Sequence, residues 1–346
     1  PPMAVSAMDG YAVRAADVAT LPATLNVIGY APAGHAFDGV VGPGEAVRIF
    51  TGAPVPDGAD TIVIQENTEQ SDEEVRVVDG TAPAGRFIRP AGLDFATGDV
   101  LLPRGRVLTA RDIGLAAAMN VPWLNVHRKP RISILATGDE IVMPGDPIGR
   151  DQIVSSNALS LGAFITALGG TPLDLGIAPD EEDGLKALAA GAGGSDILVT
   201  TGGASVGDHD LVQSVLGDIG LEVDFWRIAM RPGKPLMFGR IDGTYLIGLP
   251  GNPVSSLVCA IMFLAPAIRT MLGMADVLPR TTTARLGTDL PENDEREDYL
   301  RAALARDENG DLVATPYGKQ DSSMFATIAR ADALVVRAPF AKAART

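Results

Sequence analysis

Three loops in this sequence combine glycine with acidic or hydroxyl residues, a combination suited to holding an anion and a metal ion. Each loop follows or ends an apolar run typical of a buried strand. Glycine lets backbone N–H groups approach an oxyanion, and a following helix N-terminus adds a favourable dipole. One such loop could equally be a simple strand-to-helix turn, but three of them favour a binding site. The loops are ATGDE (136–140), TTGGASVGDHD (200–210) and GLPGNPVSS (248–256).

A short basic segment indicates the charge of the ligand. RIAMRPGKP places Arg227, Arg231 and Lys234 within eight residues of an otherwise acidic chain. PGKP predicts a rigid turn between two apparent strands, 224–230 and 235–241, and such a turn would fix these cations in place. Fixed cations suit phosphate or a tetrahedral oxyanion. The alternative is a solvated basic face.

Carboxylates beside anion-binding loops suggest Mg²⁺ bridging phosphate groups. The candidates are Asp9, Asp94, Glu140 and Asp210, although each of them could instead cap a helix or face solvent. Three histidines and one cysteine without ligand spacing argue against zinc. The sequence also lacks a nucleophile elbow, a P-loop and a G-x-G-x-x-G motif after a strand. The residues therefore indicate Mg²⁺-assisted chemistry on a phosphorylated or oxyanionic small molecule.

The elements that would position these loops form a doubly wound α/β pattern. From 131 to about 274, apolar strand-like runs alternate with helix-like stretches, which predicts a mainly parallel sheet wrapped by helices. In such sheets, ligands bind beyond the carboxyl ends of the strands. Strands are expected at 131–138, 171–177, 196–203 and 244–251, and helices at 157–169 and 181–191.

The flanking regions have a different character. Short alternating runs between about 14 and 100 predict small β-structure, and 108–119 predicts a helix with Thr109 as N-cap. After Pro279 the pattern is a small, mostly β, barrel-like domain. The fold class is thus multidomain α/β. The expected domains are a linking domain (1–13 with 101–129), a small β-rich domain (14–100), an α/β domain (130–275) and a C-terminal β domain (276–346).

Length and composition narrow the possible classes of protein. The chain has 346 residues, enough for two to four domains, and 46% of them are hydrophobic. A net charge of −15 argues against nucleic-acid and anionic-membrane surfaces. Cys259, the single cysteine, sits in an apolar run (255–265) too short to span a bilayer, so a core position and a reducing cytoplasm are expected. Both ends look cut, as expected of a fragment.

Six motifs, in order, resemble the MoeA-type molybdopterin molybdenumtransferases, the family that includes the catalytic half of gephyrin. The similarity extends from Ser6 to about Val336, and it is the co-occurrence of the motifs that is specific. The related molybdopterin adenylyltransferases lack the first motif and the C-terminal domain. The motifs are SAMDGYAV (6–13), IFTGAPVPDGADTIVIQE (49–66), ISILATGDEI (132–141), TTGGASVGDHD (200–210), RPGKP (231–235) and GLPGNPVSS (248–256).

The resemblance implies an enzyme of molybdenum cofactor synthesis. It would insert molybdate at the dithiolene of adenylylated molybdopterin and release AMP, with Mg²⁺ assisting. It also implies a homodimer of four-domain subunits with an active cleft shared between chains. Further partners would be the molybdopterin adenylyltransferase and downstream nucleotidyltransferases, with neither nucleic acid nor a membrane involved.

Matching motif by motif gives the expected site residues. Asp9 would enter the cleft from the partner subunit, and Thr51, Arg89 and Asp94 would line that side. Glu140, Asp180 and Asp210 match acidic positions, with Glu140, Asp210 and Asp94 assigned to Mg²⁺. Arg301 and Ser322 would close the molybdate pocket from the C-terminal domain. The residues expected around phosphate and molybdate are Gly202, Gly203, Ser205, Arg227, Arg231, Lys234, Pro235 and Ser255.

Two departures and two alternatives accompany this interpretation. Arg227 and Arg231 stand where lysine is common in the family, so the anion geometry is expected to differ. A helical segment before SAMDGY and the last C-terminal strand are missing, which would affect dimerisation rather than chemistry. The alternatives are a molybdopterin-binding scaffold protein, against which the intact acidic set argues, and a molybdopterin adenylyltransferase.

Overall fold

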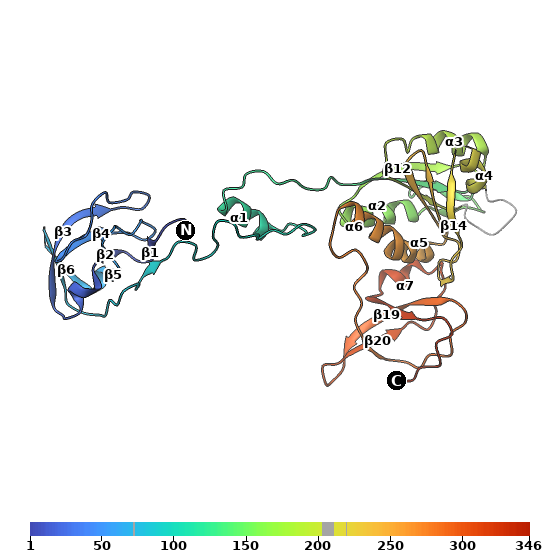
Figure 1. The fold of residues 1–346 in the computed structure, drawn as a ribbon. Coiled ribbons are helices and arrows are strands. Elements are labelled where there is room, and N and C mark those ends of the chain that lie inside the picture. The colour runs from blue at the N-terminus through green and yellow to red at the C-terminus, as the bar shows by residue number, and fades with distance from the viewer. Residues whose placement is uncertain (72, 203–210, 219) are drawn as a thin grey trace. The chain divides into compact units, whose positions relative to one another are not determined.

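The computed structural model describes residues 1–71, 73–202, 211–218 and 220–346. The chain divides into two compact units, Pro1–Leu101 and Leu102–Thr346 (Figure 1). Each unit has its own sheets and buried cores, so each is described by itself.

The first unit is built around a six-stranded sheet in the order β5-β2-β4-β3-β7-β6. Alternation places apolar side chains on both faces: Tyr11 and Val13 join one buried cluster, while Ala12 between them joins the other. Two short 3₁₀ helices and a two-stranded pair, β1 with β8, complete the unit. The elements are β1 (Val5–Ser6), β2 (Gly10–Val13), η1 (Ala15–Val18), β3 (Ala23–Ala31), β4 (Glu45–Ile49), β5 (Thr61–Ile64), η2 (Gln65–Asn67), β6 (Thr68–Gln70), β7 (Glu74–Val77) and β8 (Ile88–Arg89).

The second unit begins with a helix whose start the sequence located correctly. Helix α1 spans Ala110–Ala118, with Thr109 as N-cap. The Asp112 carboxylate accepts hydrogen bonds from the Thr109 backbone N–H at 2.8 Å and from its hydroxyl at 2.7 Å. Arg106 pairs with the same carboxylate at 2.7 Å. These contacts fix the first turn, where backbone N–H groups have no partner within the helix.

The central sheet of the second unit has six strands in the order β12-β9-β13-β17-β16-β14. The first four run parallel, and only β16 is reversed, pairing antiparallel with both β17 and β14; this confirms a mainly parallel sheet. A separate parallel pair, β10 with β11, lies outside it. The strands are β9 (Arg131–Thr137), β10 (Ile141–Val142), β11 (Ile153–Val154), β12 (Thr171–Ala178), β13 (Ile197–Thr201), β14 (Glu222–Trp226), β16 (Met237–Ile241) and β17 (Thr244–Leu249).

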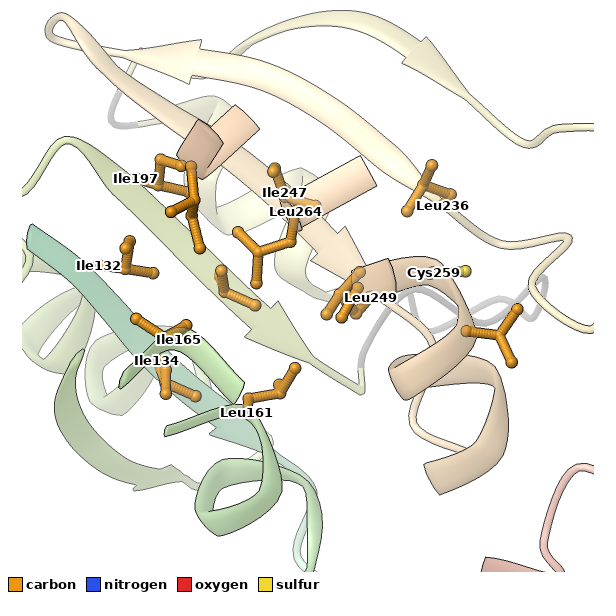
Figure 2. Close-up of a cluster of buried hydrophobic side chains, with 14 of the residues drawn as sticks. Ile132, Ile134, Leu161, Ile165, Ile197, Leu236, Ile247, Leu249, Cys259 and Leu264 are labelled. Carbon is orange, nitrogen blue, oxygen red and sulfur yellow. The ribbon is translucent and has the colours of Figure 1, made fainter. Parts of the chain in front are cut away.

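Helices cover both faces of this sheet. Ile197 and Val199 of β13 face one core, and Leu198 between them faces the other. The first core packs against α2 and the helical run α5–η3–α6 (Figure 2), and the second against α3 and α4. This arrangement confirms the predicted doubly wound domain. The helices are α2 (Asn157–Ala167), α3 (Glu182–Ala190), α4 (Leu211–Asp218), α5 (Pro253–Cys259), η3 (Ala260–Leu264, a π-helical turn) and α6 (Ala265–Met271).

A five-stranded C-terminal sheet follows, in which β19 pairs with three neighbours, β15, β20 and β21. Strand β15 comes from the RPGKP region, so this segment joins the C-terminal sheet rather than the central one. Tyr299 of β19 packs into the core below α5 and α6. The elements are β15 (Met230–Arg231), β18 (Arg285–Leu286), β19 (Glu297–Arg306), β20 (Leu312–Pro316), α7 (Phe325–Ala329) and β21 (Ala333–Arg337).

The apolar run around Cys259 is part of a longer helix than the sequence suggested. Among the described residues, the helical run Pro253–Met271 has 19 residues and a mean hydropathy of 1.7, enough by length and composition to cross a bilayer. The prediction that it is too short is therefore wrong. However, Val258, Leu264 and Ile268 are fully buried in the core beside the sheet. The helix is thus a core helix, and the core position of Cys259 is confirmed.

The multidomain α/β fold class is confirmed, whereas the four-domain division stays a prediction. Residues 10–13, expected in a linking domain, form β2 inside the six-stranded sheet of the first unit. Residues 110–118, expected in the same domain, form α1 of the second unit.

Candidate functional site

The carboxyl ends of β9, β13 and β17 meet at one edge of the central sheet. β13 lies between the other two strands and is paired with both up to its last residue, Thr201. Gly202 (φ 91°) comes so close to β9 that an added Cβ would lie 2.6 Å from the Thr137 carbonyl oxygen. An added Cβ on Gly251 would meet Gly202 Cα at 3.4 Å. The three glycine-containing loops therefore start side by side, and backbone contact holds them together.

Buried polar atoms without partners gather around these strand ends. The side chains of Thr137, Asn157 and Thr200 are 8% exposed or less, as is that of Ser256 in α5. Thr137 Oγ1, Asn157 Oδ1, Thr200 Oγ1 and Ser256 Oγ have no hydrogen-bond partner within the described part of the chain. An unsatisfied buried polar atom costs about 1–3 kcal/mol. Water or a polar ligand is the usual partner for such atoms at a site.

Asn157 also connects two elements of this edge. Its Nδ2 donates a hydrogen bond to the Gly251 carbonyl oxygen at 2.8 Å. The first residue of α2 thereby fixes the loop that follows β17. This amide is one reason why the loop stays close to Gly202.

Acidic residues follow β9 and β12 and contact each other. The backbone N–H of Asp180 donates to Asp139 Oδ1 at 3.0 Å, and the N–H of Asp139 lies 3.5 Å from Asp180 Oδ2. Glu140 folds back on Gly138, where an added Cβ would lie 2.5 Å from Oε2. Carboxylate oxygens are the ligands that Mg²⁺ prefers, so the donor type fits this metal. Among the described residues, no group of three or more His, Cys, Asp or Glu could hold a metal ion.

The three cations of the basic segment have different environments. Arg227 (φ 76°) is exposed, and its guanidinium carbon lies 4.4 Å from the Trp226 ring centroid. Arg231 pairs with Asp298 at 2.5 Å and Asp294 at 2.8 Å, which raise its pKa above the ordinary value. Lys234 is exposed and makes no ion pair with any described residue. Lys234, followed by the half-buried Pro235, is therefore free of ion pairs among the described residues, as is Arg227, whereas Arg231 is not.

Arg301 is a buried guanidinium without a carboxylate partner among the described residues. Its side chain is 1% exposed, and its Nη2 donates to the Asp321 carbonyl oxygen at 3.0 Å. Its Nε has no partner within the same set, and burial lowers its pKa from the ordinary value. Gln320 fixes the backbone by exchanging hydrogen bonds of 2.9 and 3.0 Å with residue 301. A buried cation of this kind is suited to receive an oxyanion.

The turn after Gln320 reaches the helix that follows β17. The Ser322 carbonyl oxygen accepts a 3.0 Å hydrogen bond from the Val254 backbone N–H in the first turn of α5. Ser255, the next residue, is 5% exposed. The sequence predicts one pocket for Arg301, Ser322 and Ser255. The Val254–Ser322 hydrogen bond joins the turn beside Arg301 to the first turn of α5, which contains Ser255.

In the first unit, Asp9 and Thr51 form one polar cluster. Both the backbone N–H and the hydroxyl of Thr51 donate to Asp9 Oδ1 at 2.8 Å. These two bonds, with the charge of Arg48, hold the pKa of the Asp9 carboxyl below its usual range. Asp9 is therefore ionised at neutral pH. Arg89 in β8 and Asp94 are exposed in the same unit.

Comparison with known proteins assigns the family. Residues 1–120 match the MoeA N-terminal region (domains I and II), 133–270 a probable molybdopterin binding domain, and 283–343 the MoeA C-terminal region (domain IV). A molybdopterin molybdenumtransferase from a Nostoc species is 38% identical over 308 residues, covering 86% of this chain and 70% of that relative. This chain belongs to the MoeA family.

Further relatives match nearly the whole of this chain. The molybdopterin molybdenumtransferase of Haemophilus influenzae is 34% identical, covering 96% of this chain and 82% of its own length. The crystal structure of a molybdopterin biosynthesis MoeA protein from Pyrococcus horikoshii is 32% identical, with a TM-score of 0.86 over all of this chain and 85% of that one. These matches confirm the resemblance, the fold class and a transferase of molybdenum cofactor biosynthesis.

The site residues of this MoeA chain stay predictions, but the structure shows which of them meet. Asp9 meets Thr51 in the first unit, and Asp180 meets the neighbour of Glu140 in the second. Gly203, Ser205 and Asp210 lie outside the described residues.

Sequence reasoning missed Thr137, Asn157, Thr200 and Ser256. A hydroxyl residue in or beside a strand-end glycine loop, as in LATG, TTGG and GNPVSS, was the available signal for the three hydroxyl residues; no such signal marks Asn157.

Proposed function

We propose that this MoeA-family chain transfers molybdate to the dithiolene of adenylylated molybdopterin, releasing AMP, in a reaction that needs Mg²⁺. The observation that carries this proposal is the buried Arg301 guanidinium, whose Nε has no partner and which makes no ion pair among the described residues; Asp321 attracts it only at longer range. A buried cation is strongly unfavourable until an anion supplies the missing charge. Relatives named molybdopterin molybdenumtransferase support the substrate class.

Molybdate would occupy the place where the C-terminal sheet meets α5. Arg301 offers a planar donor group, and Lys234 offers a mobile ammonium from the RPGKP loop. Ser255 lies in the first turn of α5, and the Ser322 carbonyl oxygen accepts the N–H of its neighbour Val254, so both serines lie at the start of this helix. Two cations held near one oxyanion set its position and supply proximity to the acceptor sulfurs.

Adenylylated molybdopterin would lie along the strand-end edge. Gly202 and Gly251 let the strand-end loops pack closely on Thr137 and on each other, which brings their backbones together at this edge. Thr137, Asn157 and Thr200 offer hydroxyl and amide groups that have no described partner. We assign these three residues to polar contacts with the substrate or with the water around it.

The acidic residues of this edge are proposed to serve the pyrophosphate bond. Glu140 and Asp180, with Asp210, would hold Mg²⁺, and Asp94 stays a further candidate. When bound, Mg²⁺ would neutralise the phosphate oxygens. The cations of the pocket would stabilise the charge that develops on the leaving AMP.

The deciding experiment supplies adenylylated molybdopterin, molybdate and Mg²⁺ to the purified protein and measures AMP and molybdenum cofactor together. We expect stoichiometric formation of both. AMP release without molybdenum incorporation would show that the protein only hydrolyses the substrate. If neither AMP nor molybdenum cofactor formed, the proposal would be contradicted. ATP with molybdopterin serves as the control, because a transferase of this type makes no adenylylated product.

We also propose a cytoplasmic homodimer in which Asp9 serves the cleft of the partner subunit. This proposal is supported by the family resemblance and by the ionised Asp9 carboxylate, which Thr51 holds with two hydrogen bonds. Subunits carrying Asp9→Ala and subunits carrying Lys234→Ala would each form inactive homodimers. Refolded together, they should regain about one quarter of wild-type activity, because half of the dimers are mixed and each has one intact cleft. No recovery would contradict a shared cleft.

A further inference from the structure

Arg231 and Asp298 are cross-strand neighbours where β15 pairs with β19. Arg231 Nε donates to Asp298 Oδ1 at 2.7 Å, and Nη2 donates to Oδ2 at 2.5 Å. Nη1 donates to Asp294 at 2.8 Å, and Nη2 donates again to Asn293 at 3.1 Å. A guanidinium has five N–H donors, so these bonds occupy four of them. Arg231 therefore has almost no capacity left for an additional anion.

The charges around Arg231 also disfavour an anion. One guanidinium faces two carboxylates, and the Asp298 side chain is only 9% exposed. An oxyanion placed here would have to displace a nearly buried carboxylate from a bidentate contact. It would also lie against the negative charge of Asp294. Bidentate arginine–carboxylate pairs are among the stronger contacts of this type.

Arg231 and Arg301 lie on opposite faces of β19. Side chains alternate along a strand, so Tyr299 and Arg301 share one face and Asp298 and Leu300 share the other. Tyr299 packs into the core beneath α5. Arg231, Asp298 and Leu300 instead line a cavity of about 520 Å³ on the other face. The guanidinium of Arg231 is therefore separated by the strand from the pocket of Arg301.

The same contact anchors the loop that carries Lys234. Gly233 (φ 117°) packs on the helix, where an added Cβ would lie 2.4 Å from Cys259 Sγ. The Lys234 carbonyl oxygen accepts hydrogen bonds from Ile228 at 3.0 Å and Leu236 at 3.1 Å. The loop is thus tied at Arg231, at Gly233 and across its base, whereas the Lys234 side chain is exposed.

We propose that Arg231 is a latch rather than an anion ligand, and that Asp298 is the positioning residue for Lys234. By holding the guanidinium, Asp298 sets the place from which Lys234 reaches the anion. This inference rests on the proposed function, because it concerns the pocket assigned to molybdate. The proposal gives a different role to Arg231, which stands where lysine is common in the family. Its guanidinium binds a carboxylate of the chain itself, Asp298, instead of the anion.

Equilibrium dialysis with molybdate tests the latch without the organic substrate. Arg231→Lys keeps the positive charge but loses the guanidinium that makes the bidentate contact. Asp298→Asn keeps the shape of the side chain but loses its negative charge. We expect each variant to weaken molybdate binding by about 10-fold, which is the lower end of the range of affinity losses seen when a residue that positions a ligand is changed. The double variant Arg231→Ala/Asp298→Ala should bind no more weakly than either single change, because all remove one contact. Wild-type binding by Arg231→Lys, or tighter binding by Asp298→Asn, would overturn the latch.

Amide hydrogen exchange of residues 227–236 gives a second measurement that needs no molybdate. Both single variants should speed exchange in this segment while the thermal unfolding midpoint stays within a few degrees of wild type. Asp307→Asn is the matched control, because it weakens the 2.6 Å Arg285–Asp307 pair of the same sheet without touching the loop. Unchanged exchange in both single variants would refute the latch. If the wild type itself binds no molybdate, the proposed pocket fails, and the exchange data still decide the latch.

Discussion

The backbone N–H of Val254 donates a 3.0 Å hydrogen bond to the carbonyl oxygen of Ser322. This bond joins the first turn of α5 to the turn in which the Asp321 carbonyl accepts from Arg301. The helix that follows the central sheet and the buried arginine of the C-terminal sheet are therefore parts of one structure. An anion bound there would touch residues from both sheets.

Replacing Arg301 by methionine should separate function from stability. Methionine has a similar length and removes a buried charge that makes no ion pair within the described ranges, so the free energy of unfolding should be unchanged or rise by about 1–2 kcal/mol. AMP formation should fall by at least about 100-fold, because the group that stabilises the oxyanion is lost. Chemical denaturation and the AMP assay measure the two effects.

Arg337→Met is the control for a buried arginine with a structural role. The Arg337 side chain donates to three backbone carbonyls, those of Pro291, Ala341 and Lys342. Its loss should destabilise the protein by about 2–3 kcal/mol, since these carbonyls lose a charged donor. If Arg301→Met destabilised the chain equally, Arg301 would be a structural residue instead.

Gly202→Ala should disrupt the strand-end edge. Gly202 has a φ of 91°, and the added Cβ would lie 2.6 Å from the Thr137 carbonyl oxygen, so strain and steric clash add together. We expect a loss of about 2–4 kcal/mol in the free energy of unfolding, measured in urea. Gly243→Ala has a similar φ of 84° with open space around the new atom, and should cost only about 1–2 kcal/mol. Equal costs would show that the contact with Thr137 is unimportant.

Thr51→Val should raise the pKa of Asp9. The change removes the hydroxyl that donates to Asp9 Oδ1 but leaves the Thr51 backbone N–H in place. The carboxyl pKa, now below 3.8, should therefore move part of the way back to that value. Carbonyl-detected NMR titration of Asp9 measures the shift. Thr68→Val, which removes a hydroxyl bonded to the Gln65 carbonyl, should leave Asp9 unaffected.

The start of α1 should be sensitive to acid. Hydrogen bonds from Arg106 and Thr109 lower the pKa of Asp112 to about 2. Because the folded-state pKa is depressed, the stabilisation is complete above the ordinary value of 3.8 and is lost as the pH falls through about 2. The Thr109 amide resonance should titrate with that midpoint. In Asp112→Asn this titration should disappear, and a midpoint near 4 in the wild type would contradict the assignment.

Removal of divalent cations should stop catalysis but not molybdate binding. A chelator should abolish AMP release, because the phosphate oxygens of the substrate would then repel one another without compensation. Molybdate should still bind, since Arg301 and Lys234 belong to the chain. Added Mg²⁺ should restore AMP release. Full activity in chelator would exclude a metal role for Glu140 and Asp180.

The sequence by itself determined the order of elements and the family. Apolar runs such as RISILAT and DILVTT fix buried strands by local pattern alone, and Thr109 fixes the start of α1 through its own backbone. Glycine at strand ends indicated the edge where ligands bind, because only glycine accepts that backbone geometry at Gly202. The motifs then identified MoeA, since their order does not depend on tertiary contacts.

Only the tertiary structure decided the environment of each charge and each polar group. Arg231 and Lys234 look alike in RPGKP, yet β15 places Arg231 beside Asp298 and leaves Lys234 exposed. The burial of Arg301, and the lack of partners for Thr137 and Thr200 among the residues that the structure describes, depend on strands and helices packed from distant parts of the chain. The helix that contains Cys259 likewise continues beyond the apolar run 255–265 and ends at Met271. Local residue pattern sets secondary structure, whereas solvation and ion pairing depend on which segments the fold brings together.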